Sequence, residues 1–105
     1  MTENDLYKKF IERYKDSGVV IWKAPVFKKM RWDIFGVFDL IMTYPHPNAP
    51  ITFVQITTLT NLSHRRKKIK AFFRENKIVI PNSFVFAWDH KRSLFHIEKI
   101  NDYAS

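Results

Sequence analysis

The hydrophobic residues at the start of the chain recur every three or four positions. They are Leu6, Tyr7, Phe10, Ile11 and Tyr14. This spacing puts them on one face of a helix. Thr2 or Asn4 can cap its start, and Gly18 can end it in the left-handed conformation. The pattern predicts a helix over residues 4–17.

Three short runs rich in β-branched and aromatic residues come next and predict strands. They cover residues 19–24, 38–44 and 51–58, and the proline-rich loop YPHPNAP separates the last two. Ser63 is expected to cap a second helix that ends near Asn76, with Ile69, Phe72 and Phe73 as its apolar stripe. Residues 84–89 and 94–100 flank the polar turn HKRS and predict a final pair of strands.

The predicted order is αβββαββ, an α/β or α+β fold in which helices flank a mixed central sheet. The chain has 105 residues, of which 46% are hydrophobic and 16% aromatic, enough to build the core of one domain over residues 1–105. No apolar run approaches the ~18 residues of a membrane span, and the N-terminus lacks a secretory pattern. A cytoplasmic location without membrane association is therefore expected.

Composition excludes several kinds of site. The absence of cysteine rules out disulfides, thiolate zinc sites and a cysteine nucleophile. With only two glycines, Gly18 and Gly36, the chain cannot form the glycine-rich phosphate loops, so no nucleotide cofactor is expected. The net charge of +8 favours a polyanionic partner.

Polar residues inside two predicted strands mark the candidate chemistry. Asp39 stands between Phe38 and Leu40, where an unpaired carboxylate is costly to bury. Gln55 and Thr57 alternate with apolar residues and share one strand face. If the two strands pair as a hairpin, these oxygens gather into a cluster suited to Mg²⁺ or Mn²⁺. The alternative is that Asp39 is a turn residue and that Gln55 and Thr57 face solvent.

The arrangement resembles the PD-(D/E)XK nuclease superfamily, in particular small archaeal and viral Holliday junction resolvase-like proteins. The resemblance rests on the element order, on Gly36-Val37-Phe38-Asp39 and on Gln55-Ile56-Thr57. It implies a restriction-endonuclease-like core and a metal held by Asp39, Gln55 and the main-chain carbonyl of Ile56. It also implies a glutamate on the first helix, for which Glu3 is the candidate.

Two positions depart from the family pattern. Gln55 replaces the usual acid and removes one negative charge, and Thr57 stands where a catalytic lysine is expected. In this superfamily the lysine is sometimes supplied from a neighbouring element, and the second helix offers Arg65 and Lys68 beside its apolar stripe. Lys68 is the candidate for the displaced lysine.

Basic residues dominate the second helix. Between His64 and Lys77 the only acid is Glu75, so the helix lacks the Glu–Lys pairs that usually balance such a run. Phosphate backbone would supply the missing charge, and generic solubility is the competing explanation. Residues expected to contact nucleic acid are Lys28, Lys29, Arg31, Arg65, Arg66, Lys67, Lys70 and Arg74.

Together with the basic charge, the resemblance implies a Mg²⁺- or Mn²⁺-dependent DNA endonuclease that acts on branched or duplex DNA and forms a homodimer. An inactive nucleic-acid-binding module of the same fold is the main alternative. A protein that docks its basic helix on an acidic protein partner is the third.

Overall fold

The computed structural model describes residues 2–24, 26–27, 30–31 and 33–100. It contains two α-helices, one short 3-10 helix and seven strands among these residues. In chain order they are α1 (Glu3–Tyr14), β1 (Val20–Lys23), β2 (Val26–Phe27), β3 (Met30–Arg31), β4 (Leu40–Thr43), β5 (Thr52–Thr58), η1 (Leu59–Asn61), α2 (Leu62–Asn76), β6 (Ser83–Asp89) and β7 (Leu94–Lys99).

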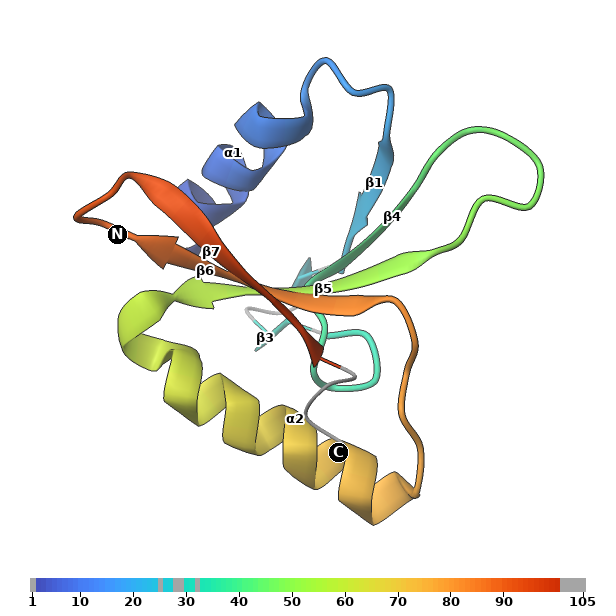
Figure 1. The fold of residues 1–105 in the computed structure, drawn as a ribbon, viewed down its shortest axis with the longest axis vertical. Helices are drawn as coiled ribbons and strands as arrows, with labels where there is room; N and C mark the ends of the chain where they lie inside the picture. Colours follow the sequence, from blue (N-terminus) through green and yellow to red (C-terminus); the bar gives the residue numbers. More distant parts are fainter. Residues whose placement is uncertain (1, 25, 28–29, 32, 101–105) are drawn as a thin grey trace.

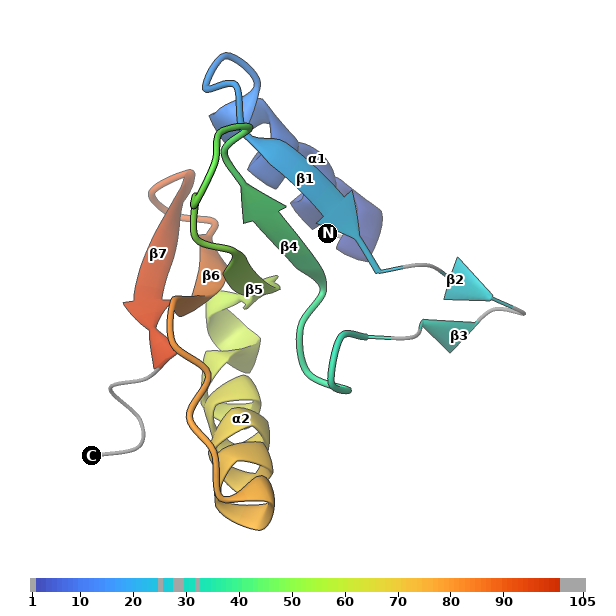
Figure 2. The same cartoon turned by 90° about the vertical axis from the view of Figure 1, so that its right-hand side faces the viewer.

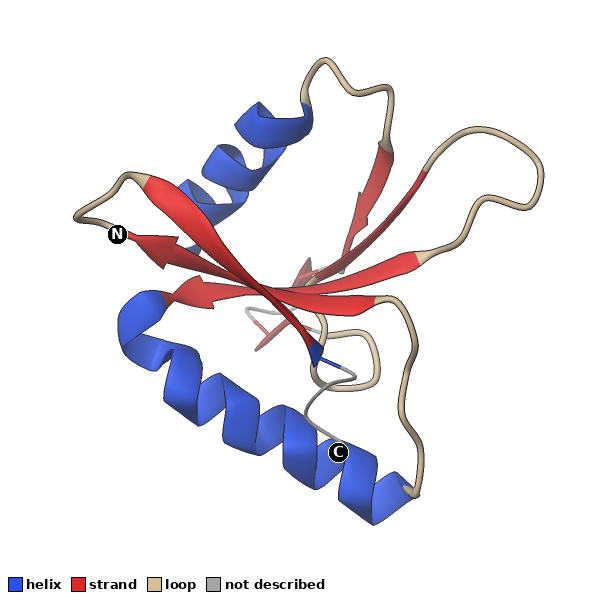
Figure 3. Cartoon of the chain, in the orientation of Figure 1, coloured by secondary structure: helices blue, strands red, loops and turns tan. Residues whose placement is uncertain are grey.

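Five strands form one mixed sheet in the order β1-β4-β5-β6-β7. β5 and β6 are parallel and are joined through α2, whereas the other neighbouring strands are antiparallel. Helices α1 and α2 lie on opposite faces of the sheet (Figures 1 and 3). The predicted mixed α+β class and the pairing of the strands around the YPHPNAP loop are confirmed.

Each face of the sheet has its own hydrophobic cluster. On one face, Leu6 and Phe10 of α1 pack with Leu40, Val54, Ile56, Phe86 and Phe95. On the other, Leu62, Ile69 and Phe73 of α2 pack with Val85, Ala87 and Ile100 among others. The alternation of side chains along β5 explains this division, since consecutive residues point to opposite faces.

Helix α1 starts with a capping box. The Asp5 main-chain N–H donates to the Thr2 hydroxyl, and the Asp5 carboxylate accepts from the Thr2 main-chain N–H. The helix ends at Tyr14 rather than at the predicted residue 17. The main-chain N–H and the hydroxyl of Ser17 both donate to the Tyr14 carbonyl, which closes the last turn early. Gly18, at φ 78°, lies in the connection to β1 and is not the cap.

Helix α2 also starts differently from the prediction. Its first residue is Leu62 and its N-cap is Asn61, so Ser63 lies inside the helix and does not cap it. The reason is that η1 feeds directly into α2, and Leu62 is buried in the core at 5% exposure. The helix ends near Asn76 as predicted, with Lys77 in the left-handed conformation at φ 55°.

A short antiparallel hairpin of β2 and β3 was not predicted and forms a separate two-stranded sheet. It projects from the main sheet between β1 and the turn that precedes β4 (Figure 2). After this hairpin the chain returns through residues 33–37, and β4 pairs with β1 in the main sheet.

Within the described part of the chain, no helix combines the length and the apolar character needed to cross a membrane.

Candidate functional site

Asp39 lies at the point where β4 begins to pair with β5. Its main-chain N–H donates to the carbonyl of Val54 at 2.9 Å, and the next residue, Leu40, is in register with Val54. A turn stabilised by the Gly36 N–H and the Asp33 carbonyl leads into this position. Because Leu40 packs toward α1, the alternation of the strand directs Asp39 to the α2 face.

The Asp39 carboxylate lies at the centre of the site. Its Oδ2 accepts hydrogen bonds from the Ile56 main-chain N–H at 2.6 Å and from Gln55 Nε2 at 2.7 Å. Gln55 Nε2 also donates to the Ile56 carbonyl at 3.1 Å. Both side chains are buried, Asp39 at 6% exposure and Gln55 at 2%. The predicted convergence of Asp39 and Gln55 is therefore confirmed.

The orientation of the Gln55 amide follows from its neighbours. Asp39 Oδ2 and the Ile56 carbonyl oxygen are both acceptors, so the amide nitrogen must be the atom that faces them. Gln55 Oε1 then points away, and it is buried with no hydrogen-bond partner among the described residues.

This orientation decides whether the residues present fit a hard cation. The sequence assigned a metal to Asp39, Gln55 and the carbonyl of Ile56, but an N–H₂ group now lies between the two other oxygens. A cation needs oxygen ligands there and is repelled by a donor. The described residues also contain no group of three His, Asp or Glu side chains that could hold a metal. As arranged, the site does not fit Mg²⁺ or Mn²⁺.

Of two further predicted catalytic residues, Thr57 lies near this centre and Glu3 does not. Thr57 is buried at 3% exposure on the same face as Gln55 and pairs in register with Ala87 of β6. Glu3 is exposed in the first turn of α1, the helix that covers the opposite face. The structure therefore groups Thr57 with Gln55 and places Glu3 on the other side of the sheet.

Lys68 lies on the flank of α2 that faces the turn before Asp39. Phe72, one helical turn after Lys68, contacts Phe35 of that turn with ring centroids 6.1 Å apart. Residues four apart share a helix flank, so Lys68 faces the same way. Arg65, one turn earlier, is half-buried on this flank. Arg65 and Lys68 thus both lie beside the apolar stripe of α2, as the sequence predicted.

The outer face of α2 carries a stripe of exposed basic residues. Lys67, Lys70 and Arg74 follow one another at three- and four-residue spacing, and all three are exposed. By helix geometry they lie on the side of α2 away from Lys68 and Phe72. We call Lys67, Lys70 and Arg74 the basic stripe.

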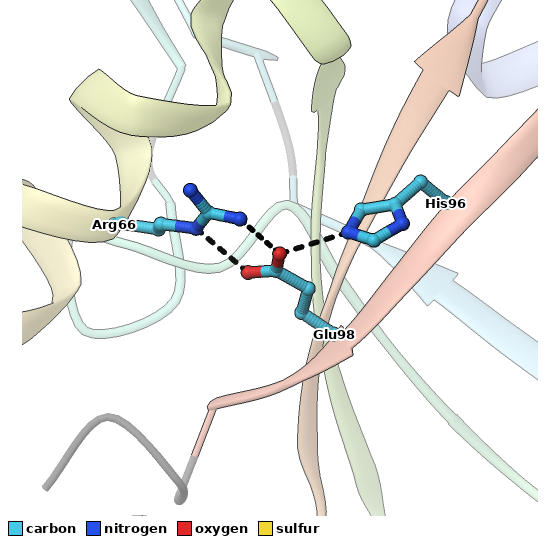
Figure 4. A network of polar contacts seen from close by, with 3 residues as sticks. All are labelled: Arg66, His96 and Glu98. Atoms are coloured by element: carbon cyan, nitrogen blue, oxygen red, sulfur yellow. Dashed lines mark hydrogen bonds and ion pairs between the residues drawn. The ribbon is translucent and has the colours of Figure 1, made fainter.

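Arg66 belongs to a different contact from the rest of the basic helix. Its guanidinium donates from Nε to Glu98 Oε1 at 2.8 Å and from a terminal nitrogen to Glu98 Oε2, and His96 Nε2 lies 2.8 Å from the same Oε2 (Figure 4). This bidentate pair ties α2 to the edge strand β7. Sequence analysis did not find it, since the partners are 32 positions apart.

The remaining predicted nucleic-acid contacts lie in the segment of the β2–β3 hairpin. Lys28 and Lys29 are outside the described residues. The main chain of Arg31 belongs to β3.

No family model, curated protein or solved structure matches the chain. The functional conclusion therefore rests on the residues themselves.

Proposed function

We propose that the protein is a DNA-binding domain of the PD-(D/E)XK kind that contacts the phosphate backbone through the basic stripe of α2. The observation that carries this proposal is the stripe itself. Lys67, Lys70 and Arg74 present three positive charges on one exposed helix face, and the only acid within α2 is Glu75. Exposed positive charges on one helix face attract a polyanion such as the phosphate backbone.

The centre at Asp39 supports a binding role over a catalytic one. The Gln55 amide donates to the two oxygens that a metal would need, and Thr57 cannot supply the positive charge of a lysine. The intramolecular hydrogen bonds give Asp39 a structural purpose, because its carboxylate accepts the Ile56 N–H at the start of the hairpin. The intracellular location expected from the sequence belongs to the same proposal.

The experiment is fluorescence anisotropy with a labelled duplex across a salt series. Changing Lys67, Lys70 and Arg74 together to alanine should weaken binding and flatten the dependence of log K on log salt by about 0.9 for each lost phosphate contact. Lys67→Ala alone should weaken binding, whereas Lys99→Ala, which removes an exposed charge from β7, should not. Equal effects of these two single changes would show that net charge alone governs binding.

Metal-dependent DNA cleavage is a second candidate, favoured by two placements. Asp39 and Gln55 meet in a buried pair, and Lys68 lies on the helix flank that faces the turn before Asp39. Activity would require the Gln55 amide to turn over and present Oε1. Incubation of branched and duplex DNA with the protein and Mg²⁺ or Mn²⁺ tests this candidate, and cleavage abolished by both Asp39→Ala and Lys68→Ala would support it.

The homodimer expected from the sequence stays a prediction. The edge strand β1 supports it, because Val20 and Trp22 are 53% and 52% exposed there. Apolar side chains on an exposed sheet edge favour association. Light scattering would measure the oligomeric state of the protein and of its Trp22→Lys variant. We expect the mass of a dimer for the protein and the mass of a monomer for the variant.

A further inference from the structure

Trp88 lies at the end of the sheet between two hollows that the proposed duplex contact does not use. One hollow, of about 430 Å³, lies between α1 and the β6–β7 hairpin, and the other, of about 580 Å³, lies between that hairpin and η1. Trp88 lines both. Figure 1 shows the β6–β7 turn between the two helices at this end of the molecule.

The first hollow combines positive charge with an aromatic wall. Lys8, Lys9 and Arg13 line it from α1, and Lys9 Nζ lies 4.8 Å from the centre of the Trp88 ring. The acid in its wall, Glu12, forms an ion pair with Lys15 at 2.7 Å. The hollow therefore favours an anion next to a flat ring.

The second hollow also combines basic side chains with the Trp88 ring. Its wall contains the side chains of Thr58 and Thr60 together with the basic turn residues Lys91 and Arg92. Asp89, which also lines it, accepts hydrogen bonds from the main-chain N–H groups of Lys91 and Arg92 at 3.0 and 3.2 Å. Its Oδ1 thus accepts from the turn and its Oδ2 forms an ion pair with Arg92 Nε at 3.9 Å, while the lysine and arginine side chains are exposed.

Trp88 itself carries an unsatisfied group. The ring is half-buried and packs edge-on against Phe95, with centroids 5.1 Å apart. Its Nε1–H is buried and has no hydrogen-bond partner among the described residues, which is unusual because buried indole N–H groups normally find an acceptor. Lys9 lies over the ring, so displacement of this lysine side chain by a ligand would open the indole to stacking.

We propose that this Trp88 site binds an unpaired strand of nucleic acid, with a base on the Trp88 ring and phosphates on Lys8, Lys9 and Arg13 on one side and on Lys91 and Arg92 on the other. An aromatic platform flanked by cations is the arrangement by which proteins hold single strands without reading their sequence. The inference rests on the proposed function for the class of ligand and extends it from duplex to single strand. A domain with both surfaces suits DNA in which a duplex meets an unpaired strand.

The test uses Trp88 as its own reporter. In a Trp22→Phe/Trp32→Phe background, Trp88 is the one remaining tryptophan of the three in the sequence. A short oligothymidylate should quench its fluorescence to saturation. The Lys8→Ala/Lys9→Ala variant should bind roughly ten-fold more weakly or worse, because both changes remove cations that contact the strand. Lys99→Ala, which removes an exposed charge of the same sign outside both hollows, is the control and should leave the affinity unchanged.

Three outcomes overturn the proposal. They are no saturable quenching of the folded protein, equal binding by the Lys8→Ala/Lys9→Ala variant and the Lys99→Ala control, and binding of inorganic polyphosphate as tight as that of oligothymidylate. Trp88→Phe should retain part of the affinity for a labelled oligothymidylate, measured by fluorescence anisotropy, and Trp88→Ala should lose it, with circular dichroism confirming that each variant is folded.

The duplex experiment keeps this inference distinguishable from the proposed function. If oligothymidylate quenches Trp88 but the protein shows no salt-sensitive duplex binding, the role of the basic stripe is refuted and the Trp88 site is still supported. If the protein binds duplex DNA but oligothymidylate does not quench Trp88, the Trp88 site is refuted and the role of the basic stripe is still supported.

Discussion

The amide nitrogen of Gln55 lies 2.7 Å from Oδ2 of Asp39, a residue sixteen positions earlier on the neighbouring strand. The same oxygen accepts the Ile56 main-chain N–H at 2.6 Å. Asp39 precedes the first residue of β4, so its carboxylate supplies an acceptor to β5 just where the strand pairing begins. One buried carboxylate thus stabilises the start of the hairpin and orients the Gln55 amide.

Replacement of Asp39 by alanine should destabilise the fold. It leaves two buried donors, the Ile56 N–H and Gln55 Nε2, without their acceptor, and each such group costs about 1–3 kcal/mol. Asp39→Asn should cost less, since an amide oxygen can still accept. Urea unfolding followed by circular dichroism measures the difference, and Asp16→Ala, at an exposed position, is the control. Equal midpoints for Asp39→Ala and the control would contradict the structural role of Asp39.

The fold was predictable where periodicity was strong. The apolar positions of α1 and α2 and the runs of β-branched and aromatic residues in β5 and β6 predicted these elements and their order along the chain. The order of the strands within the sheet was not predicted beyond the pairing of β4 with β5. The β2–β3 hairpin was missed because the two residues between its strands, Lys28 and Lys29, lack the Asn-Gly or Asp-Gly signal of short hairpins. The start of α2 was misplaced because a hydroxyl residue is only a weak signal when a buried leucine precedes it.

The site was predictable only as far as two strands bring residues together. The Asp39–Gln55 contact follows from the hairpin register, which the loop between the strands suggested. The direction of the Gln55 amide could not be predicted, because it depends on which neighbours accept hydrogen bonds. The Trp88 site was also missed, although the basic residues Lys8, Lys9 and Arg13 on the polar part of the first helix were a usable signal.

The Arg66–Glu98 pair should contribute measurably to stability. It is bidentate and the Glu98 side chain is only 17% exposed, so we expect a coupling energy of about 1 kcal/mol, at the upper end for pairs near a surface. A double-mutant cycle with Arg66→Ala and Glu98→Gln measures it by urea unfolding. The matched comparison is the Lys15–Glu12 pair, whose side chains are 56% and 70% exposed and whose coupling should be smaller. A coupling at Arg66–Glu98 no larger than that of the exposed pair would refute this expectation.

The capping box of α1 should make stability depend on pH in the acid range. Hydrogen bonds from the main chain and hydroxyl of Thr2 lower the pKa of Asp5 below its ordinary value of 3.8. A carboxyl whose pKa is lower in the folded state stabilises the fold above its unfolded pKa, and this contribution is lost as the pH falls through the folded pKa. Asp5→Asn should remove that part of the acid dependence. Thr2→Ala should raise the pKa of Asp5 toward 3.8, which carbon-detected NMR titration measures directly.

Gln55→Glu tests whether the centre at Asp39 can accept a cation. The change replaces a donor by a second carboxylate within about 3 Å of Asp39, so repulsion should destabilise the protein at neutral pH and raise the pKa of one of the two carboxyl groups. Stability should then increase as the pH falls through that raised pKa, because the proton removes the repulsion. Addition of Mg²⁺ or Mn²⁺ at neutral pH should restore stability in the same way.

The wild-type protein is the essential comparison in that experiment. Its Gln55 amide donates to Asp39 and to the Ile56 carbonyl, so divalent cations should leave its thermal midpoint nearly unchanged. Gln55→Leu controls for loss of the amide without added charge and should show no response to metal. A rise in the midpoint of the wild type with Mg²⁺ equal to that of Gln55→Glu would mean that the amide turns over readily to bind a cation. In that case metal-dependent cleavage, the second candidate function, would be better supported than a binding role without catalysis.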